Sequence, residues 1–126
     1  MAPRLALLLL LASILAACGP AKEPTYSVEK TKSCLVEKGA NVGGPLDFVA
    51  STATGGALHA KLPANAVTIA FGANTGDAQQ IEKAYVRFHA RNVGISDILK
   101  RYSNAVLLWK QHPEQSDLDT VTSCLE

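Results

Sequence analysis

The chain has little net charge and only a few residues of the kinds that build metal or redox sites. Twelve lysines and arginines stand against 11 aspartates and glutamates in 126 residues, and the formal net charge is +1. Proteins that bind nucleic acid usually carry a clear positive excess. This balance therefore argues against nucleic acid as a partner. Only three cysteines and three histidines are present.

Motifs of metal binding, hydrolysis and phosphate binding are missing as well. There is no His-x-x-x-His or Cys-x-x-Cys spacing and no Gly-x-Ser-x-Gly elbow. Asp117 and Asp119 are two residues apart, so they point in different directions on a helix. The loop at 72–76 lacks the lysine and the full glycine pattern of a phosphate loop. We therefore expect no metal, no cofactor and no catalytic residue. The three histidines are His59, His89 and His112.

The chain also lacks an apolar run long enough to span a membrane. Its longest run, from Leu5 to Ala16, is shorter than the roughly 20 residues that a spanning helix needs, and Gly19 and Pro20 follow soon after it. One cation, Arg4, precedes the run. A short basic start, an apolar stretch and small residues after it are typical of a signal peptide.

The end of this segment, Leu15-Ala16-Ala17-Cys18, resembles the lipobox of bacterial lipoproteins. The resemblance covers residues 1–18 only. It implies that the thiol of Cys18 receives a diacylglycerol, that the chain is cut before it, and that a further acyl chain such as palmitate is added. Two or three acyl chains anchor a protein firmly. The alternative is an ordinary secretory signal with a chance cysteine.

The resemblance also implies a place in the cell envelope, on the extracytoplasmic side of a membrane. Gly19 stands where some such proteins carry an aspartate that retains them in the inner membrane, so inner and outer membrane both remain open. We divide the chain into a cleaved signal peptide at 1–17, a lipidated cysteine and short tether at 18–24, and one domain at 25–126. Six residues, 19–24, span at most about 20 Å. A partner should therefore lie near the bilayer.

Two cysteines remain in the domain, Cys34 and Cys124, and we expect a disulfide between them in an oxidising compartment. A loop of about 90 residues closed in this way contributes roughly 4 to 5 kcal/mol in the chain-entropy model. A redox pair is the alternative, but catalytic dithiols usually sit close together as Cys-x-x-Cys.

Hydrophobic periodicity predicts an α+β domain with the order α-β-β-β-α-β-α, in which helices pack on one face of a mostly antiparallel sheet of three or four strands. Part of this order resembles a ferredoxin-like plait, which by itself indicates no function. We expect a tight turn at Pro63-Ala64-Asn65, a short helical turn at 96–100, and a central strand at 105–109 that is covered on more than one side and places Trp109 in the core. The predicted helices lie at 25–38, 77–94 and 116–125, and the predicted strands at 46–50, 58–62, 67–71 and 105–109.

One surface feature stands out on the helix predicted at 77–94. Lys83, Arg87 and Arg91 are spaced by four residues and turn away from the apolar positions Ile81, Tyr85 and Phe88, which we expect to be buried. Such a basic stripe can contact anionic headgroups, a cell-wall polymer or an acidic protein surface. An ordinary solvated helix face is the alternative.

From the sequence we expect a lipid-anchored, non-enzymatic binding or assembly module at the membrane surface. Its partners would be the membrane, through the anchor, and an envelope protein or an anionic polymer. The alternative is a small-ligand carrier or sensor that uses the glycine-rich segment Gly39 to Gly56 as a lid. An enzyme is the least favoured class, because the sequence contains no recognisable set of catalytic residues.

Overall fold

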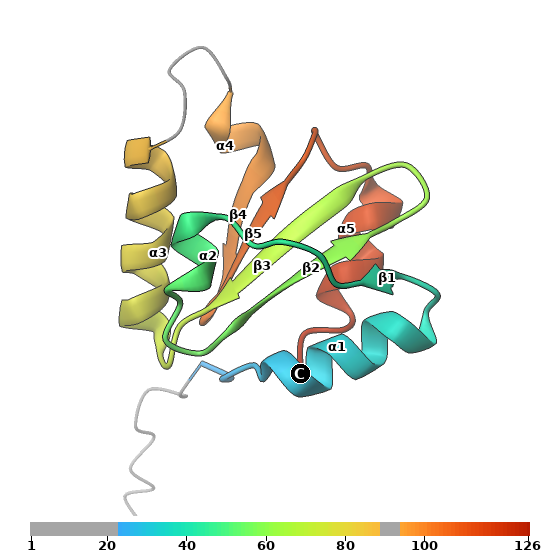
Figure 1. Cartoon of the computed structure of the whole chain (residues 1–126), viewed down its shortest axis with the longest axis horizontal. Helices are drawn as coiled ribbons and strands as arrows, with labels where there is room; N and C mark the ends of the chain where they lie inside the picture. Colours follow the sequence, from blue (N-terminus) through green and yellow to red (C-terminus); the bar gives the residue numbers. More distant parts are fainter. Residues whose placement is uncertain (1–22, 89–93) are drawn as a thin grey trace, which may run out of the picture.

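The computed structural model describes residues 23–88 and 94–126, and these form a five-stranded sheet with helices around it (Figure 1). The helices are α1 (Val28–Glu37), α2 (Phe48–Ser51), α3 (Thr75–Phe88), α4 (Ile95–Ile98) and α5 (Gln115–Thr122). The strands are β1 (Asn41–Val42), β2 (Ala57–Lys61), β3 (Ala66–Phe71), β4 (Leu99–Tyr102) and β5 (Ala105–Trp109).

The sheet is antiparallel throughout, with the strand order β1-β2-β3-β5-β4. β2 and β3 form the predicted hairpin, in which the backbone N–H of Leu62 donates to the carbonyl of Asn65 at 2.8 Å across the turn. β5 lies between β3 and β4, and its Trp109 is only 1% exposed. The mixed α+β class, the hairpin and the central position of β5 are confirmed.

Helices cover both faces of the sheet, whereas we predicted one covered face. On one side, Ile69 of β3 packs with Leu35 of α1 and Val121 of α5. On the other side, Ala70 of the same strand packs with Ile81 of α3. The central strands are apolar at almost every position because both of their faces are buried.

The segment predicted as an edge strand at 46–50 is instead occupied by the short helix α2. Asp47 explains the difference, because its Oδ1 accepts a hydrogen bond from the backbone N–H of Ala50 at 2.9 Å and so caps the helix. The edge strand lies earlier, at β1. The alternating pattern of Leu46 to Ala50 therefore indicated the wrong element.

A fifth strand, β4, follows the predicted helical turn, which the structure has as α4. β4 pairs with β5 through a turn in which Ser103 adopts a positive φ of 51°. The sheet is thus one strand larger than the upper limit that we predicted. Lys100 and Arg101 interrupt the apolar character of β4, which is why its sequence gave no strand signal.

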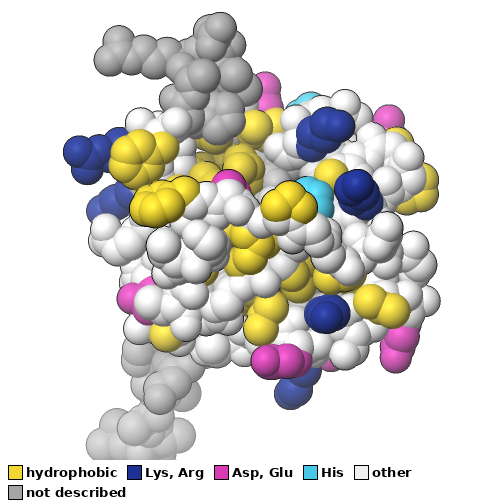
Figure 2. All heavy atoms as spheres, viewed as in Figure 1, with side chains coloured by type: hydrophobic (Ala, Val, Ile, Leu, Met, Phe, Trp, Pro, Cys, Tyr) yellow, Lys and Arg dark blue, Asp and Glu magenta, His cyan; other side chains and the backbone are white. Residues whose placement is uncertain are grey.

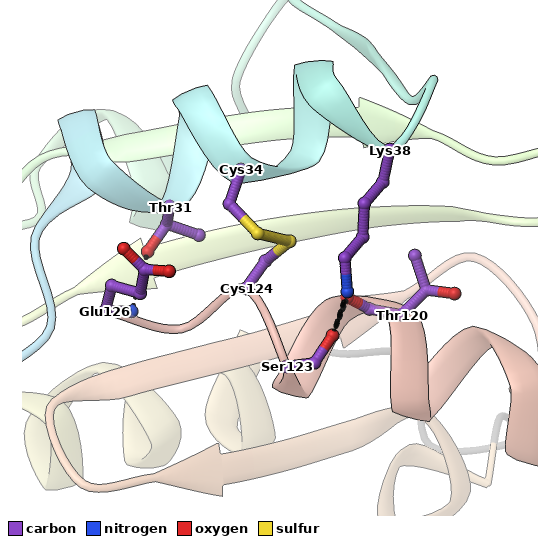
Figure 3. The surroundings of a disulfide bond; sticks show 7 residues. All are labelled: Thr31, Cys34, Lys38, Thr120, Ser123, Cys124 and Glu126. Atoms are coloured by element: carbon purple, nitrogen blue, oxygen red, sulfur yellow. Dashed lines mark hydrogen bonds between the residues drawn. A yellow bond between two sulfur atoms is a disulfide. The ribbon is translucent and has the colours of Figure 1, made fainter.

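The predicted disulfide joins Cys34 of α1 to Cys124 after α5, with a Cα–Cα distance of 5.3 Å (Figure 3). Two further contacts reinforce this connection. The backbone N–H of Glu126 donates to the hydroxyl of buried Thr31 at 3.5 Å, and the amine of Lys38 donates to the hydroxyl of Ser123. The first helix is therefore fastened to the end of the chain.

The beginning of the described chain is fastened near the start of α3. The hydroxyl of Thr75 donates to the carboxylate of Glu23 at 3.0 Å. The side chain of Asn104 holds the backbone N–H and carbonyl of Tyr26 at 2.6 and 3.0 Å. The described part of the chain therefore begins beside the N-terminal end of α3 (Figure 1).

Candidate functional site

A groove of about 440 Å³ lies between α2 and α3, and we call it the α2–α3 groove. Residues of α2 and its cap form one wall of the groove, residues of α3 form the other, and one residue of β5 also lines it. Its lining is Asp47, Phe48, Val49, Tyr85, Phe88 and Leu108.

Two aromatic side chains stand out into solvent at this groove. Phe48 is 78% exposed and Phe88 is 69% exposed, while Val49 and Leu108 are half-buried. Figure 2 shows hydrophobic side chains beside Lys or Arg side chains at the end of α3 that carries Phe88. Isolated exposed apolar residues are common, but two large ones at one groove indicate a contact surface.

A partly buried hydrogen bond fixes the two walls of the groove to each other. The hydroxyl of Tyr85 donates to the carboxylate of Asp47, with distances of 2.9 and 3.1 Å to its two oxygens. Burial, the hydrogen bond and the negative charge of Asp47 together raise the pKa of Tyr85 above that of a free phenol. Tyr85 therefore stays protonated and acts as a donor that ties α3 to α2.

Positive charge lies directly beside the groove. The guanidinium of Arg87 lies over the ring of Phe88, 5.7 Å from its centroid, which is the geometry of a cation–π contact. Lys83, one turn earlier, is exposed as well but does not line the groove. Among the described residues the one ion pair joins Arg101 to Glu82, at 3.7 Å. Lys83 and Arg87 of the predicted stripe thus both lie on the solvent side of α3, whereas Arg91 lies outside the described residues.

Phe88 is the residue of this helix that the sequence placed wrongly. Ile81 and Tyr85 are 8% and 5% exposed, as expected for the buried stripe, but Phe88 is not buried. It lies in the last described turn of α3, where the groove toward α2 is open. Neither Phe48 nor Asp47 was predicted as a site residue. The signal that could have indicated them is Asp47 as an N-cap, which would place the start of a short helix at Phe48.

The other predicted features do not come together as a site. His59 is half-buried, with its Nδ1 3.1 Å from the hydroxyl of Thr68, whereas His112 is exposed and His89 lies outside the described residues. Within 23–88 and 94–126, no three His, Cys, Asp or Glu side chains are grouped so that they could hold a metal. At the start of α3, the carboxylate of Asp77 accepts from the hydroxyl of Thr54 at 2.8 Å, which puts negative charge where an anion would bind.

A second cavity of about 320 Å³ lies beside the glycine-rich segment. Its lining includes Gly43 and Gly44 together with Glu29, Lys32 and His59. The backbone N–H of Gly43 donates to the carbonyl of His59 at 2.8 Å, so this part of the segment is fixed to β2.

No family model, curated protein or solved structure matches this chain. None of the described helices is both long and apolar enough to cross a bilayer. Cys18 lies outside the described residues, so the anchor rests on the sequence pattern of residues 15–18. A function is therefore inferred from the chemistry of the groove and from the position of Glu23 beside the start of α3.

Proposed function

We propose that this protein is a lipid-anchored, non-enzymatic binding module in the bacterial cell envelope, and that it holds an envelope partner in the α2–α3 groove. The observation that carries this proposal is the exposure of Phe48 and Phe88, at 78% and 69%, on either side of an apolar groove. Aromatic side chains that fill or flank a pocket supply much of the binding energy of protein interfaces.

The sequence supports the anchor and the compartment. The pattern Leu15-Ala16-Ala17-Cys18 supplies the lipidated cysteine, and the Cys34–Cys124 disulfide fits an oxidising environment outside the cytoplasm. Only four residues, 19–22, lie between Cys18 and Glu23, the first described position, so the domain stays within about 20 Å of its membrane.

The lining of the groove supports binding over catalysis. Its titratable side chains are Asp47 and Tyr85, and these are bonded to each other. The carboxylate of Asp47 also accepts from the backbone of Ala50. A general base or nucleophile needs a free atom within reach of a substrate. These two groups instead fix the shape of the surface that a partner meets.

A small-ligand carrier or sensor is the second candidate, and the cavity beside Gly43 and Gly44 favours it. Lys32, Glu29 and His59 would give a ligand polar contacts there. A compound that stabilises the protein thermally, with the effect lost in Lys32→Gln and kept in Lys83→Gln, would support this candidate.

The anchor is tested by labelling cells with an alkyne-bearing palmitate. We expect label on the wild-type protein and none on Cys18→Ser, because the acylated thiol is then missing. Label that persists on Cys18→Ser would contradict the proposed anchor.

The groove is tested separately by crosslinking the anchored protein in membranes and recovering its partners. A Phe48→Ala and Phe88→Ala double variant should lose a partner that wild type captures. Val36→Ala is the matched control, because Val36 is also exposed, at 53%, but lies on α1. Identical partners in all three proteins would contradict a role for the groove.

A further inference from the structure

We infer that the α2–α3 groove recognises a peptide segment of an envelope protein in which a large apolar side chain stands next to an acidic residue. This inference rests on the proposed function and names the chemistry of its partner. The groove supplies the apolar half of the recognition, and the cations of α3 supply the charged half.

The size and lining of the groove determine which apolar side chain of the peptide can enter it. A volume of about 440 Å³ lies in the range of pockets that enclose a compact ligand, which gives room for one or two large side chains. Phe48, Phe88, Val49 and Leu108 present only apolar atoms from their side chains. A Leu, Phe or Trp side chain that enters here buries its surface against two aromatic rings.

The charges on the two walls set the position of the acidic residue. Arg87 is exposed on α3 and its guanidinium lies over Phe88 at the groove, while Lys83, outside the groove lining, adds positive charge one turn earlier on the same helix. A guanidinium in this position can bind a carboxylate through two parallel hydrogen bonds. On the α2 wall, the negative charge of Asp47 repels an acidic residue. The peptide is therefore oriented with its carboxylate toward α3 and away from α2.

The placement of the groove favours a protein over the bilayer that carries the anchor. The tether meets the domain at Glu23, which accepts from Thr75 in the first turn of α3. Phe88 lies at the opposite end of this helix, 13 residues on, which is about 20 Å away at 1.5 Å per residue. Figure 1 shows the chain entering at the lower end of α3, away from its Phe88 end. The groove is also concave and carries a carboxylate, Asp47, that anionic headgroups would repel.

The test is a selection of random displayed peptides on the full lipidated protein, held in nanodiscs of phosphatidylcholine. We expect selected peptides to be enriched in a large apolar residue with an acidic neighbour. Binding of a synthesised winner should weaken by about tenfold or more in Phe88→Ala, as for an interface aromatic. A Lys83→Gln and Arg87→Gln variant should remove the preference for acidic residues and keep that for apolar ones.

A Lys30→Gln variant is the control for charge, because Lys30 is exposed on α1, which packs on the opposite face of the sheet from α3. Selected peptides without acidic residues, or peptides that bind all variants equally, would overturn the inference while the anchor stands. Failure of the protein to enter nanodiscs would overturn the anchor and, with it, this inference. Stronger contact of Phe48 and Phe88 with phosphatidylglycerol vesicles than with any peptide would assign the groove to the bilayer instead.

Discussion

A single buried amide, that of Asn104, connects three parts of the chain. The residue is 1% exposed and sits in the turn between β4 and β5. Its Oδ1 accepts from the backbone of Tyr26 at 2.6 Å, and its Nδ2 donates to the carbonyl of Gly72 at 2.8 Å. Asn104 thus links the entry of the tether to the strand end that leads into α3.

We predict that Asn104→Ala lowers the free energy of unfolding by about 3 kcal/mol. The change removes several hydrogen bonds and leaves buried backbone groups of Tyr26 and Gly72 unpaired, which costs more than the bonds themselves contribute. Urea denaturation measures the loss. Asn41→Ala is the control, because Asn41 is exposed and should change stability by no more than about 0.5 kcal/mol. Equal stability of the two variants would contradict the role of Asn104.

Because of the Tyr85–Asp47 hydrogen bond, we expect the free energy of unfolding to depend on pH in the alkaline range. Because the folded protein holds the Tyr85 proton more tightly than the unfolded chain, where the phenol pKa is about 10, its stabilising effect is complete below pH 10 and declines above it. The added slope approaches about 1.4 kcal/mol per pH unit. Tyr85→Phe should remove this slope and cost about 1 kcal/mol near neutral pH.

Denaturation curves of wild type and Tyr85→Phe, recorded near neutral pH and at a series of pH values above the phenol pKa of about 10, test this prediction. The difference in stability between them should shrink as pH rises above about 10. A difference that stays constant across this range would show that Tyr85 ionises freely in the folded protein.

For single residues, the sequence was sufficient to predict burial or pairing where this depends on the residue's own chemistry or on helical spacing. Cys34 and Cys124 are paired, Trp109 is buried, and Lys83 and Arg87 are exposed, all as predicted. Phe88 was placed wrongly because its exposure depends on how far α2 covers α3, and helical periodicity contains no information on that neighbour.

Among the elements, α1 depends on its covalent link to the end of the chain. α1 has two buried side chains, Thr31 and Leu35, and the disulfide fixes it beside the segment after α5. The sequence separation of 90 residues makes this a long loop, for which the chain-entropy model gives the larger stabilisations.

We predict that reducing the disulfide lowers the free energy of unfolding by about 4 kcal/mol. Urea denaturation with and without a reductant measures this change, and a Cys34→Ser and Cys124→Ser variant should match the reduced protein in both conditions. Wild-type protein whose denaturation midpoint does not move on complete reduction would contradict the account of α1.

The sequence predicted long, regular elements better than short ones. The hairpin of β2 and β3, helix α3 and strand β5 were all found, because each has several residues of consistent periodicity. α2 and β4 have four residues each, too few to show a period. α2 depends on the cap at Asp47, and β4 depends on pairing with β5, which is remote from local sequence preference.

Over the whole molecule, the first described residue, Glu23, and the exposed Phe88 of the groove lie at opposite ends of α3. Glu23 meets Thr75 in the first turn, and Phe88 stands in the last described turn. With the proposed anchor at Cys18, this arrangement would turn the groove toward the envelope space. The sequence predicted the anchor and the cations, but the groove required α2 and α3 to be placed in three dimensions.

Photocrosslinking in living cells can show whether the α2–α3 groove holds an envelope partner. Phe88 is replaced by p-benzoylphenylalanine in the lipidated protein, and Val36 is replaced in a matched control, since both are exposed apolar residues. The account predicts one envelope protein crosslinked at position 88, through a segment with apolar and acidic residues, and its loss when Lys83→Glu and Arg87→Glu are added. No protein crosslinked at position 88, or the same proteins at both positions, would contradict it.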